Sequence, residues 1–521
     1  MTRPTTTGKA QDLITFTRST TGTALAKISY GEELVTNGDF SSDSDWQKGS
    51  NTTIVNGEAV FNGALSYVYQ NAVTVGKLYF CSVTVNTWNS GAALSVGSSA
   101  TGAGTIYSNI ERVSNTTTEF YFTAQTTTLG IGSRSFNVDG SIDNISVKEV
   151  LYDQPDGTLQ LFNHPINKPR IEYDAEGNCL GLLVEEARTN VVPYSDLSAH
   201  WNWVNTTDIG GAATAPDGTQ TATLMRENTA GTAHIAFAAI VSSSTSTTAS
   251  IFAKAGGRRY LQLSASTNQN SWAMFDLEQG VVTEQKSSGI TATIEPYGNG
   301  WYRCKAALTL SASGSTTNFV WGSSILATTN GIRNVYHGDG TSGIYLWGAQ
   351  VETGSFPTSY IPTSGSTVTR STDVASLAVS EFGYNQDQGT VVAEAAPSDI
   401  SSGGRVFSLN DGTGSNVMRS QAQNSNHFIV ISGGAVQGNI DAGTFANNTF
   451  STLSGAYKQN DIAACIDGGA VVTDTSATIP TITNLSIGQR YDGNNKINGH
   501  IKSIQYYPLR LSNAQLQALT V

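Results

Sequence analysis

Apolar and polar residues alternate with a period of two along most of this chain. Clear runs in its first two thirds are Leu78–Val85, Glu119–Thr123, Ser250–Ala255 and Trp301–Ala306. Successive side chains of a β-strand point to opposite faces, so each run predicts a strand with one buried face. Clusters of Gly, Asn, Asp and Ser separate the runs, as in antiparallel sheets joined by tight turns. The pattern therefore predicts an all-β fold.

The alternation continues through the last third of the chain. The strands expected there are Val391–Ala395, Arg405–Leu409, His427–Ile431, Ile462–Ile466, Leu485–Gly488 and Gly499–Tyr507. The best helix signal lies at the end of the chain, where Ser512 stands at an N-cap position and Leu516 and Leu519 share one helical face. We predict one short helix after these strands.

Two segments carry signals for a hairpin and for a linker. Pro169–Tyr194 predicts a hairpin, with a strand at Ile171–Tyr173, a turn at Asp174–Asn178 and an apolar strand at Leu180–Val184. Ser355–Thr363 predicts an extended linker, because its prolines disfavour helix and cannot donate ladder hydrogen bonds.

Two regions share one layout, in which an Asp-apolar opening and a tryptophan precede several alternating runs and a closing strand. The first opens at Leu34–Phe40 and closes at Gly140–Val147, and the second opens at Tyr194–Leu197 and closes at Ile344–Glu352. At 521 residues the chain is also too long for one core. We therefore expect tandem antiparallel β-sandwiches, in five segments: 1–33, 34–150, 151–190, 191–367 and 368–521.

Composition excludes several classes of partner. The net charge is −12 and the densest basic site is Arg258-Arg259, which argues against nucleic acid, because that affinity depends on Lys and Arg at phosphates. Binding to an anionic membrane surface is disfavoured for the same reason, and no apolar run is long enough to span a bilayer. The polar N-terminus also lacks the apolar core of a signal peptide. We expect neither nucleic-acid binding nor membrane insertion.

Residues typical of catalysis or of metal binding are scattered. Cys81, Cys179, Cys304 and Cys465 lie far apart, which favours reduced, half-buried thiols over disulfides or zinc ligands. Glycan-cleaving enzymes need two facing carboxylates. Glu185 and Glu186 are adjacent, so on a strand they point to opposite faces and cannot form such a pair. We expect no enzymatic activity.

Several phrases resemble a family of bacteriophage tail-fibre and virion adhesins. Gly181–Asn190 (GLLVEEARTN) and Phe356–Thr363 (FPTSYIPT) resemble sequence motifs of this family. Leu13–Ser19 resembles the segment that precedes the ARTN motif in its members. More than 100 residues separate Leu13–Ser19 from the ARTN motif, which indicates an inserted domain. Within this family, Glu185 or Arg188 is expected to tie its strand to the neighbouring sandwich.

The sandwiches carry further resemblances. The opening of 34–150 with Asp45-Trp46, and its IDNISV ending, resemble jelly-roll carbohydrate-binding modules, in which the two form neighbouring strands. The second unit is expected to be another jelly roll. The ending of 368–521 resembles concanavalin A-like, laminin-G-type sandwiches.

The resemblance implies a non-enzymatic virion protein that binds host-surface glycan through its sandwiches. It would be assembled in the host cytoplasm, exposed on the particle, attached to other virion proteins by its N-terminal region, and trimeric, because three weak sites gain avidity. A capsid decoration or head-fibre protein with a structural role remains an alternative. A glycan depolymerase tailspike is a further alternative, although no β-helix period is present.

Aromatic residues in polar surroundings are the candidates for sugar contacts. Trp88 lies in a polar stretch read as a loop, and Tyr67, Tyr69 and Tyr107 are expected on the same concave sheet, although packing in the core stays open for all four. Trp272 and Tyr260 are weaker candidates, and Trp46, Trp201, Trp301 and Trp347 are expected in cores. In the last segment, Tyr491 and Asn494 belong to a turn that resembles a ligand-rim loop, and a hairpin without function explains it equally well.

A structural calcium ion is the one cofactor considered. Jelly-roll carbohydrate modules hold such an ion near their terminal strands, with an Asp of the last strand as ligand. Asp143 matches that position and Asp39 lies on the opening strand, and carboxylate oxygens are ligands that calcium prefers.

Overall fold

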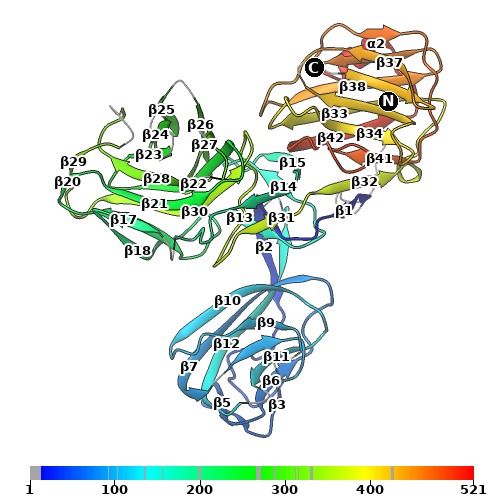
Figure 1. Cartoon of the computed structure of the whole chain (residues 1–521). Coiled ribbons are helices and arrows are strands. Elements are labelled where there is room, and N and C mark those ends of the chain that lie inside the picture. The colour runs from blue at the N-terminus through cyan, green and yellow to red at the C-terminus, as the bar shows by residue number, and fades with distance from the viewer. Residues whose placement is uncertain are drawn as a thin grey trace. The chain divides into compact units, whose positions relative to one another are not determined.

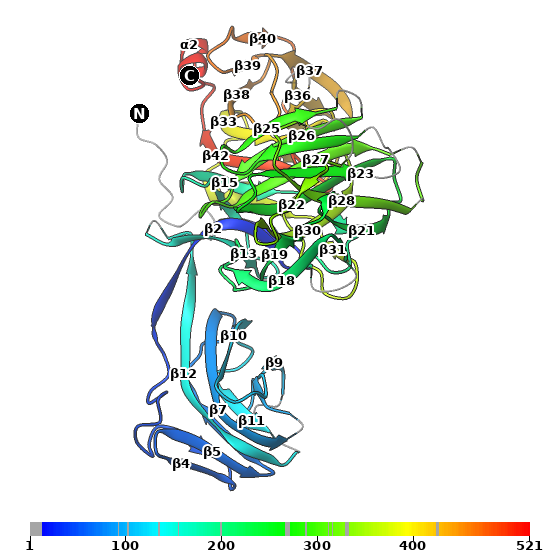
Figure 2. The ribbon, with the colours of Figure 1, turned by 90° about the vertical axis from the view of Figure 1, so that its left-hand side faces the viewer.

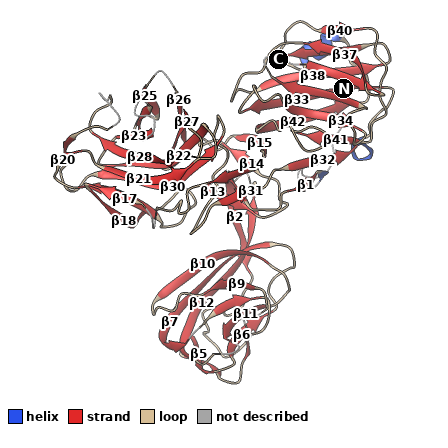
Figure 3. Ribbon diagram, viewed as in Figure 1, coloured by secondary structure: helices blue, strands red, loops and turns tan. Residues whose placement is uncertain are grey.

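The computed structural model describes residues 13–521 except 92, 102–103, 134–135, 155, 198–200, 266–270, 287–288, 311, 315, 329–332 and 424–426. Strands make up nearly all of its regular structure (Figure 3), which confirms the all-β, antiparallel prediction. The chain divides into two compact units, Lys27–Thr158 and Met1–Ala26 with Leu159–Val521 (Figure 1). No helix in the described ranges is long and apolar enough to cross a bilayer. The first 12 residues of the expected attachment arm lie outside the described residues. So does His200, which precedes Trp201 in the opening of the second sandwich.

The unit Lys27–Thr158 is a sandwich of two antiparallel sheets (Figure 2). One sheet has the order β10-β7-β12-β2, with β5 also on β12 and β4 on β5. Its strands are β2 (Gly22–Glu33), β4 (Thr52–Val55), β5 (Glu58–Gly63), β7 (Leu78–Gly91), β10 (Thr116–Thr123) and β12 (Val138–Tyr152). The second sheet has the order β3-β6-β11-β8-β9. Its strands are β3 (Gln47–Lys48), β6 (Ser66–Gln70), β8 (Ser95–Gly97), β9 (Ile106–Asn109) and β11 (Leu129–Ser133).

The expected opening and closing strands of this sandwich do lie side by side. The amide of Leu34 donates to the carbonyl of Val147 at 3.0 Å, and the amide of Ile145 donates to that of Gly38 at 2.9 Å. The core between the two sheets includes Trp46, as predicted from its framework position.

The second sandwich lies in the larger unit. It too has two antiparallel sheets, each with six strands. One contains β17 (Asn202–Val204), β21 (Ile235–Val241), β28 (Thr316–Ser324), β23 (Tyr260–Ala265), β24 (Trp272–Asp276) and β25 (Val281–Gln285), in that order. The other contains β18 (Thr206–Ala213), β19 (Ala222–Glu227), β30 (Gly343–Thr353), β22 (Ser246–Gly256), β27 (Tyr302–Thr309) and β26 (Ile290–Pro296). Two further short strands, β20 (Gly231–Thr232) and β29 (Tyr336–His337), pair with each other in a separate two-stranded sheet.

The predicted linker packs against the outside of this sandwich. Its Tyr360 lies against Trp347 and Phe252, with ring centroids 4.8 Å and 5.8 Å apart. Leu161 of β13 (Thr158–His164) belongs to the same buried cluster as Trp301 and Trp347. Trp201 packs instead in the core between the sheets, so all four framework tryptophans are buried, as predicted.

The C-terminal sandwich takes strands from distant parts of the chain. One sheet has the order β1 (Thr15–Thr17), β32 (Val374–Ala378), β41 (Asn484–Ile487), β34 (Gly404–Asn410), β35 (Val417–Ala422), β36 (His427–Ser432) and β37 (Ala435–Asp441). The other has β14 (Ile171–Tyr173), β15 (Cys179–Val184), β42 (Gly499–Tyr507), β33 (Gln388–Pro397), β38 (Ser451–Lys458), β39 (Ile462–Ile466) and β40 (Val472–Asp474). The expected hairpin is β14–β15, and both it and the N-terminal strand complete this sandwich.

The end of the chain contains α2 (Asn513–Ala518), and a 3-10 turn, η1 (Val379–Phe382), follows β32. Ser512 caps α2 in a capping box with Gln515, and Leu516 is buried, which confirms the predicted helix and its cap.

Charged residues of the motif segments form a buried ion network in the larger unit. Asp373 accepts from Arg18 at 3.1 Å and from Arg170, and Glu185 pairs with Arg170 at 2.8 Å and Arg370 at 3.3 Å. Glu185 also accepts from the amide and hydroxyl of Ser359, both at 2.7 Å. Just beyond it, β16 (Arg188–Asn190) pairs with β31 (Val368–Arg370). Glu185 thus ties its strand to the linker of the neighbouring sandwich, as expected.

Candidate functional site

Three aromatic side chains share the solvent-facing side of one sheet in the unit Lys27–Thr158. They are Tyr30 of β2, Phe80 of β7 and Tyr121 of β10, here called the aromatic platform. Tyr79 and Cys81 belong to the core, so the strand alternation turns Phe80 outward. Tyr121 is paired directly with Phe80 and therefore lies on the same face. Tyr30 is 42% exposed and Tyr121 is 39% exposed, which leaves both rings accessible to a ligand.

The geometry of the platform shows that its two tyrosines lie along the sheet surface. Tyr30 and Tyr121 belong to strands three places apart in the order β10-β7-β12-β2, so their Cα atoms are at least about 14 Å apart. Their hydroxyls nevertheless hydrogen-bond at 2.8 Å, which requires both side chains to reach toward each other. Phe80 lies between them, with ring centroids 5.2 Å from Tyr30 and 5.3 Å from Tyr121.

Polar groups surround the platform on the same face. Strand register places Ser82, Glu119 and Lys148 next to Phe80 and Tyr121. Burial raises the pKa of the Tyr30 phenol, and its hydrogen bond with the Tyr121 hydroxyl raises it further. The Tyr30 phenol therefore stays protonated at neutral pH, and the platform offers hydroxyl groups together with the apolar surface of its rings. The arrangement can bind a molecule that has both an apolar face and hydroxyl groups.

The sequence pattern does not predict the platform. Tyr30 falls in the expected N-terminal segment 1–33, although β2 continues into the first sandwich. Phe80 and Tyr121 lie in runs that were correctly predicted as strands. The available signal was an aromatic residue at an outward position of each run, where alternation expects a polar one.

Tyr67 and Tyr69 lie on the other sheet. Val68, between them on β6, is fully buried in the core, so both tyrosines point away from it. Their ring centroids are 6.3 Å apart and the rings are tilted by 37°. Gly130 and Gly132 of β11 are their cross-strand partners. They form a second, smaller aromatic pair on the outer face of this sheet.

Trp88 and Tyr107 take positions that differ from the expected ones. Trp88 lies on β7 and not in a loop, and both side chains pack against the core. The Tyr107 ring stacks on Phe122 with centroids 4.4 Å apart. The expectation that all four candidates line one concave sheet was therefore wrong, because β6 and β9 belong to one sheet and β7 to the other.

Tyr491 and Asn494 belong to a tight turn after β41, as expected. The amide of Gly493 donates to the Arg490 carbonyl at 3.0 Å, and the Asn494 side chain donates to Asp492 at 3.0 Å. Arg490 lies over the Tyr491 ring, 5.4 Å from its centroid. The Asn494 amide is thus engaged within the turn, and the half-buried Tyr491 forms part of its surface.

Asp39 and Asp143 bind neighbouring backbone in the structure. Asp39 accepts from the Ser41 amide at 3.3 Å, and Asp143 accepts from the amide and side chain of Asn144 at 2.6 Å and 3.0 Å. Among the residues described, no group of three or more His, Cys, Asp or Glu side chains is placed to hold a metal ion. The calcium site stays a prediction. The four cysteines are free thiols, three of them buried and Cys179 exposed.

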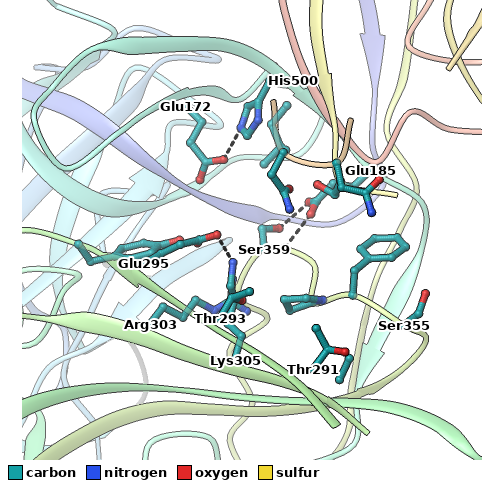
Figure 4. Close-up of a pocket in the computed structure, with 18 residues that line it drawn as sticks. Glu172, Glu185, Thr291, Thr293, Glu295, Arg303, Lys305, Ser355, Ser359 and His500 are labelled. Carbon is teal, nitrogen blue, oxygen red and sulfur yellow. Dashed lines mark hydrogen bonds and ion pairs between the residues drawn. The ribbon is translucent and has the colours of Figure 1, made fainter. Parts of the chain in front are cut away.

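Figure 4 shows a charged cavity of about 220 Å³ in the larger unit. Its carboxylates contact neighbouring side chains: Glu172 contacts the His500 ring at 2.7 Å, Glu295 contacts Lys305, and Glu185 belongs to the ion network. Burial alone would raise the pKa of Glu295, but Lys305 lowers it overall. Glu295 and Glu185 are therefore held in ion pairs with cationic side chains.

No protein-family model matches the chain, and no curated protein matches it. Among solved structures, it is similar to the CBM40 domain of Ruminococcus gnavus IT-sialidase bound to α2,3-sialyllactose (15% identity, 26% of this chain, 84% of that chain, TM-score 0.24). It is also similar to the CBM22-1–CBM22-2 tandem domain of Paenibacillus barcinonensis Xyn10C (11%, 62%, 98%, TM-score 0.20). A third similar structure is domains LG4-5 of the mouse laminin α1 chain (12%, 58%, 88%, TM-score 0.18). At these identities, a function for this chain has to be argued from its own side chains.

Proposed function

We propose that this chain is a non-enzymatic virion appendage protein that binds host-surface glycan on the aromatic platform of its first sandwich. The observation that carries the proposal is the contact between the Tyr30 and Tyr121 hydroxyls across the sheet. It holds both rings along the surface, with Phe80 between them, and leaves them exposed.

The chemistry of this surface matches that of a pyranose. A sugar ring has one face rich in C–H groups, which packs on an aromatic ring, and a rim of hydroxyls. Sites for small ligands likewise combine apolar and aromatic surface with a few polar groups that fix orientation. Here the rings of the platform supply the stacking surface. The two phenol hydroxyls and the neighbouring Ser82, Glu119 and Lys148 supply the polar groups.

Binding without cleavage is supported by the ion pairs of the charged cavity. Retaining and inverting glycosidases use two facing carboxyl groups, one of which must be protonated to act as an acid. The arginines beside Glu185 and the ammonium group of Lys305 beside Glu295 lower the pKa of these two carboxyl groups. We expect no release of reducing ends from a bound polysaccharide.

A single exposed platform of this size is expected to bind weakly, so the proposal includes a trimer on the virion. Joining three sites makes the later binding events intramolecular and raises the avidity without any new contact. The predicted virion attachment lies in the N-terminal segment. Light scattering of the purified chain measures the oligomer, and antibody labelling of intact particles locates the protein.

The function is tested on a glycan array with the full chain and matched variants. Tyr30→Ala and Tyr121→Ala each remove one stacking ring from an exposed position, so binding should fall at least about tenfold while the fold is kept. Tyr67→Ala and Tyr69→Ala are the controls, because they remove rings of the same type from the other sheet. Trp88→Ala is a poorer test, since Trp88 packs against the core. Binding that survives both platform variants would contradict the proposed site.

A further inference from the structure

A second group of polar side chains lies on the outer face of a sheet in the C-terminal sandwich. It consists of Arg405 on β34, Arg419 on β35 and Arg490 in the turn after β41, here called the arginine cluster. Arg419 is paired with Ser408. Met418 beside it and Ala422 three residues further on belong to the core, so Arg419 points outward. Arg405 is paired with Gln421, two residues from Arg419 on the same face. This diagonal places the two Cα atoms about 7–8 Å apart.

A β-bulge is the reason that Arg405 joins the cluster. The register of β34 and β35 shifts between Arg405 and Phe407, and both Val406 and Phe407 are buried in the core. Without the extra residue, strand alternation would turn Arg405 toward the core with Phe407. The bulge thus places a second guanidinium beside Arg419, and bulges of this kind are frequent at binding sites.

Three buried polar atoms of this face are unsatisfied. In the described part of the chain, Nε of Arg405, Nε of Arg419 and Oγ of Ser408 have no hydrogen-bond partner. Arg405 is 7% exposed, Arg419 is half-buried, and Ser408 is fully buried. Buried donors in folded proteins nearly always have an acceptor, and leaving one without it costs about 1–3 kcal/mol. Arg405 and Arg419 therefore have donors left over for an acceptor at this face, and no carboxylate among the described residues pairs with either of them.

The charges of the cluster also favour an anion. Burial, followed by Arg419 and Arg490, lowers the pKa of Arg405 to about 10. Burial and Arg490 likewise lower the pKa of Arg419. Asp492 partly offsets the repulsion, but it already pairs with Arg490, whose Nε donates to it at 2.8 Å. Three guanidinium groups thus face one carboxylate that is already engaged.

We propose that Arg405 and Arg419 bind the carboxylate of an acidic sugar. A guanidinium presents parallel N–H groups that match the two oxygens of a carboxylate. The Tyr491 ring lies beside the cluster and provides apolar surface for the sugar that carries the carboxylate. That the carboxylate belongs to a sugar rests on the proposed function. The anion site itself rests only on the cluster.

The probe is sodium glucuronate, added to the full chain at constant ionic strength and followed by saturation-transfer NMR and calorimetry. The protein carries Tyr30→Ala and Tyr121→Ala, so that a signal cannot come from the platform. Glucuronate should bind to this protein, and glucose should bind at least about tenfold more weakly. Loss of glucuronate binding in the platform variant, when the unmodified chain binds it, would overturn the inference and leave the proposed function intact.

Arg405→Gln and Arg419→Gln, each in the same background, should abolish the glucuronate signal. Arg333→Gln, which removes an exposed arginine from the second sandwich, should keep it. If one cluster variant does not fold, the other carries the test. Arg419→Lys keeps the charge but loses the paired N–H groups, and should bind at least about fivefold more weakly. Sodium sulfate should displace bound glucuronate only when the sulfate concentration exceeds the glucuronate concentration. A chain that binds sulfate but not glucuronate would overturn the assignment to a sugar.

Discussion

The ion network and the arginine cluster each contain three arginines, but their electrostatic environments differ. In the network, Arg18, Arg170 and Arg370 surround the carboxylates of Asp373 and Glu185 at 2.8–3.8 Å, and all five side chains are nearly inaccessible. In the cluster, Arg405 and Arg419 have no carboxylate in an ion pair in the described ranges, and Asp492 pairs with Arg490.

The difference separates arginines that hold the fold together from arginines that are available to a ligand. The network joins parts of the chain that are far apart in sequence. Its residues lie just after β1 (Arg18), just before β14 (Arg170), just after β15 (Glu185), and at and beyond the end of β31 (Arg370, Asp373). The cluster uses two adjacent strands and one turn, and in the described part of the chain neither Arg405 nor Arg419 pairs with a carboxylate. Charge-changing substitutions should therefore have opposite effects on stability at the two places.

Asp373→Asn should have the largest effect. It removes a negative charge from between buried arginines, and breaking a buried pair in this way costs about 3–5 kcal/mol. Hydrogen exchange of the amides of β15 and β31 measures the loss in the affected part of the chain. Asp387→Asn, at an exposed position of the same sandwich, is the matched control and should change exchange little. Equal effects of the two substitutions would show that Asp373 stabilises the fold no more than an exposed carboxylate does.

Glu185 should make the stability of the network depend on pH. Burial alone would raise the pKa of Glu185, but Arg370, Arg170 and Ser359 lower it well below its usual value of 4.5. The stabilisation is therefore complete above the unfolded value and is lost as the pH falls below about 4.5 toward the lowered folded value. Glu185→Gln should reduce stability by about 2–4 kcal/mol at pH 7 and by progressively less at pH 4 and pH 3.

The pH experiment compares acid unfolding of the unmodified chain, Glu185→Gln and Glu381→Gln. Glu381 is exposed in η1, so its substitution should leave the acid transition unchanged. The difference between the unmodified chain and Glu185→Gln should narrow as the pH falls. A difference that stays constant down to pH 3 would show that the carboxylate charge of Glu185 does not stabilise the network.

Local patterns predicted the strands well, because alternation depends only on neighbouring residues. The runs Ile462–Ile466 and Gly499–Tyr507 coincide with β39 and β42, and Ser512 caps the predicted helix. The prediction that Trp88 lies in a loop was wrong, because its polar neighbours are also typical of a loop. In fact β7 continues to Gly91, paired with β12, whose backbone satisfies that of the polar stretch.

The two candidate sites depend on features that no local pattern contains. The platform requires β2 and β10 to lie on either side of β7 and β12, and this order is set by pairings between distant segments. The arginine cluster requires the bulge before Phe407, since an uninterrupted alternation would place Arg405 in the core. Strand order and register therefore decide which outward residues meet, whereas the sequence indicates only which residues point outward.

Arg419→Gln should have the smallest effect on stability, and in the opposite direction to Asp373→Asn. It removes a partly buried charge that has two like-charged neighbours, so the C-terminal sandwich should be unchanged or more stable by up to about 1 kcal/mol. Because salt screens the repulsion between partly exposed charges, the gain should shrink as sodium chloride rises from 0.05 M to 0.5 M, where the Debye length falls below about 5 Å. Urea unfolding followed by hydrogen exchange in β34 and β35 measures both effects. A loss of stability comparable to that of Asp373→Asn would mean that Arg419 is held by structural contacts, and that the two groups of arginines serve the same purpose.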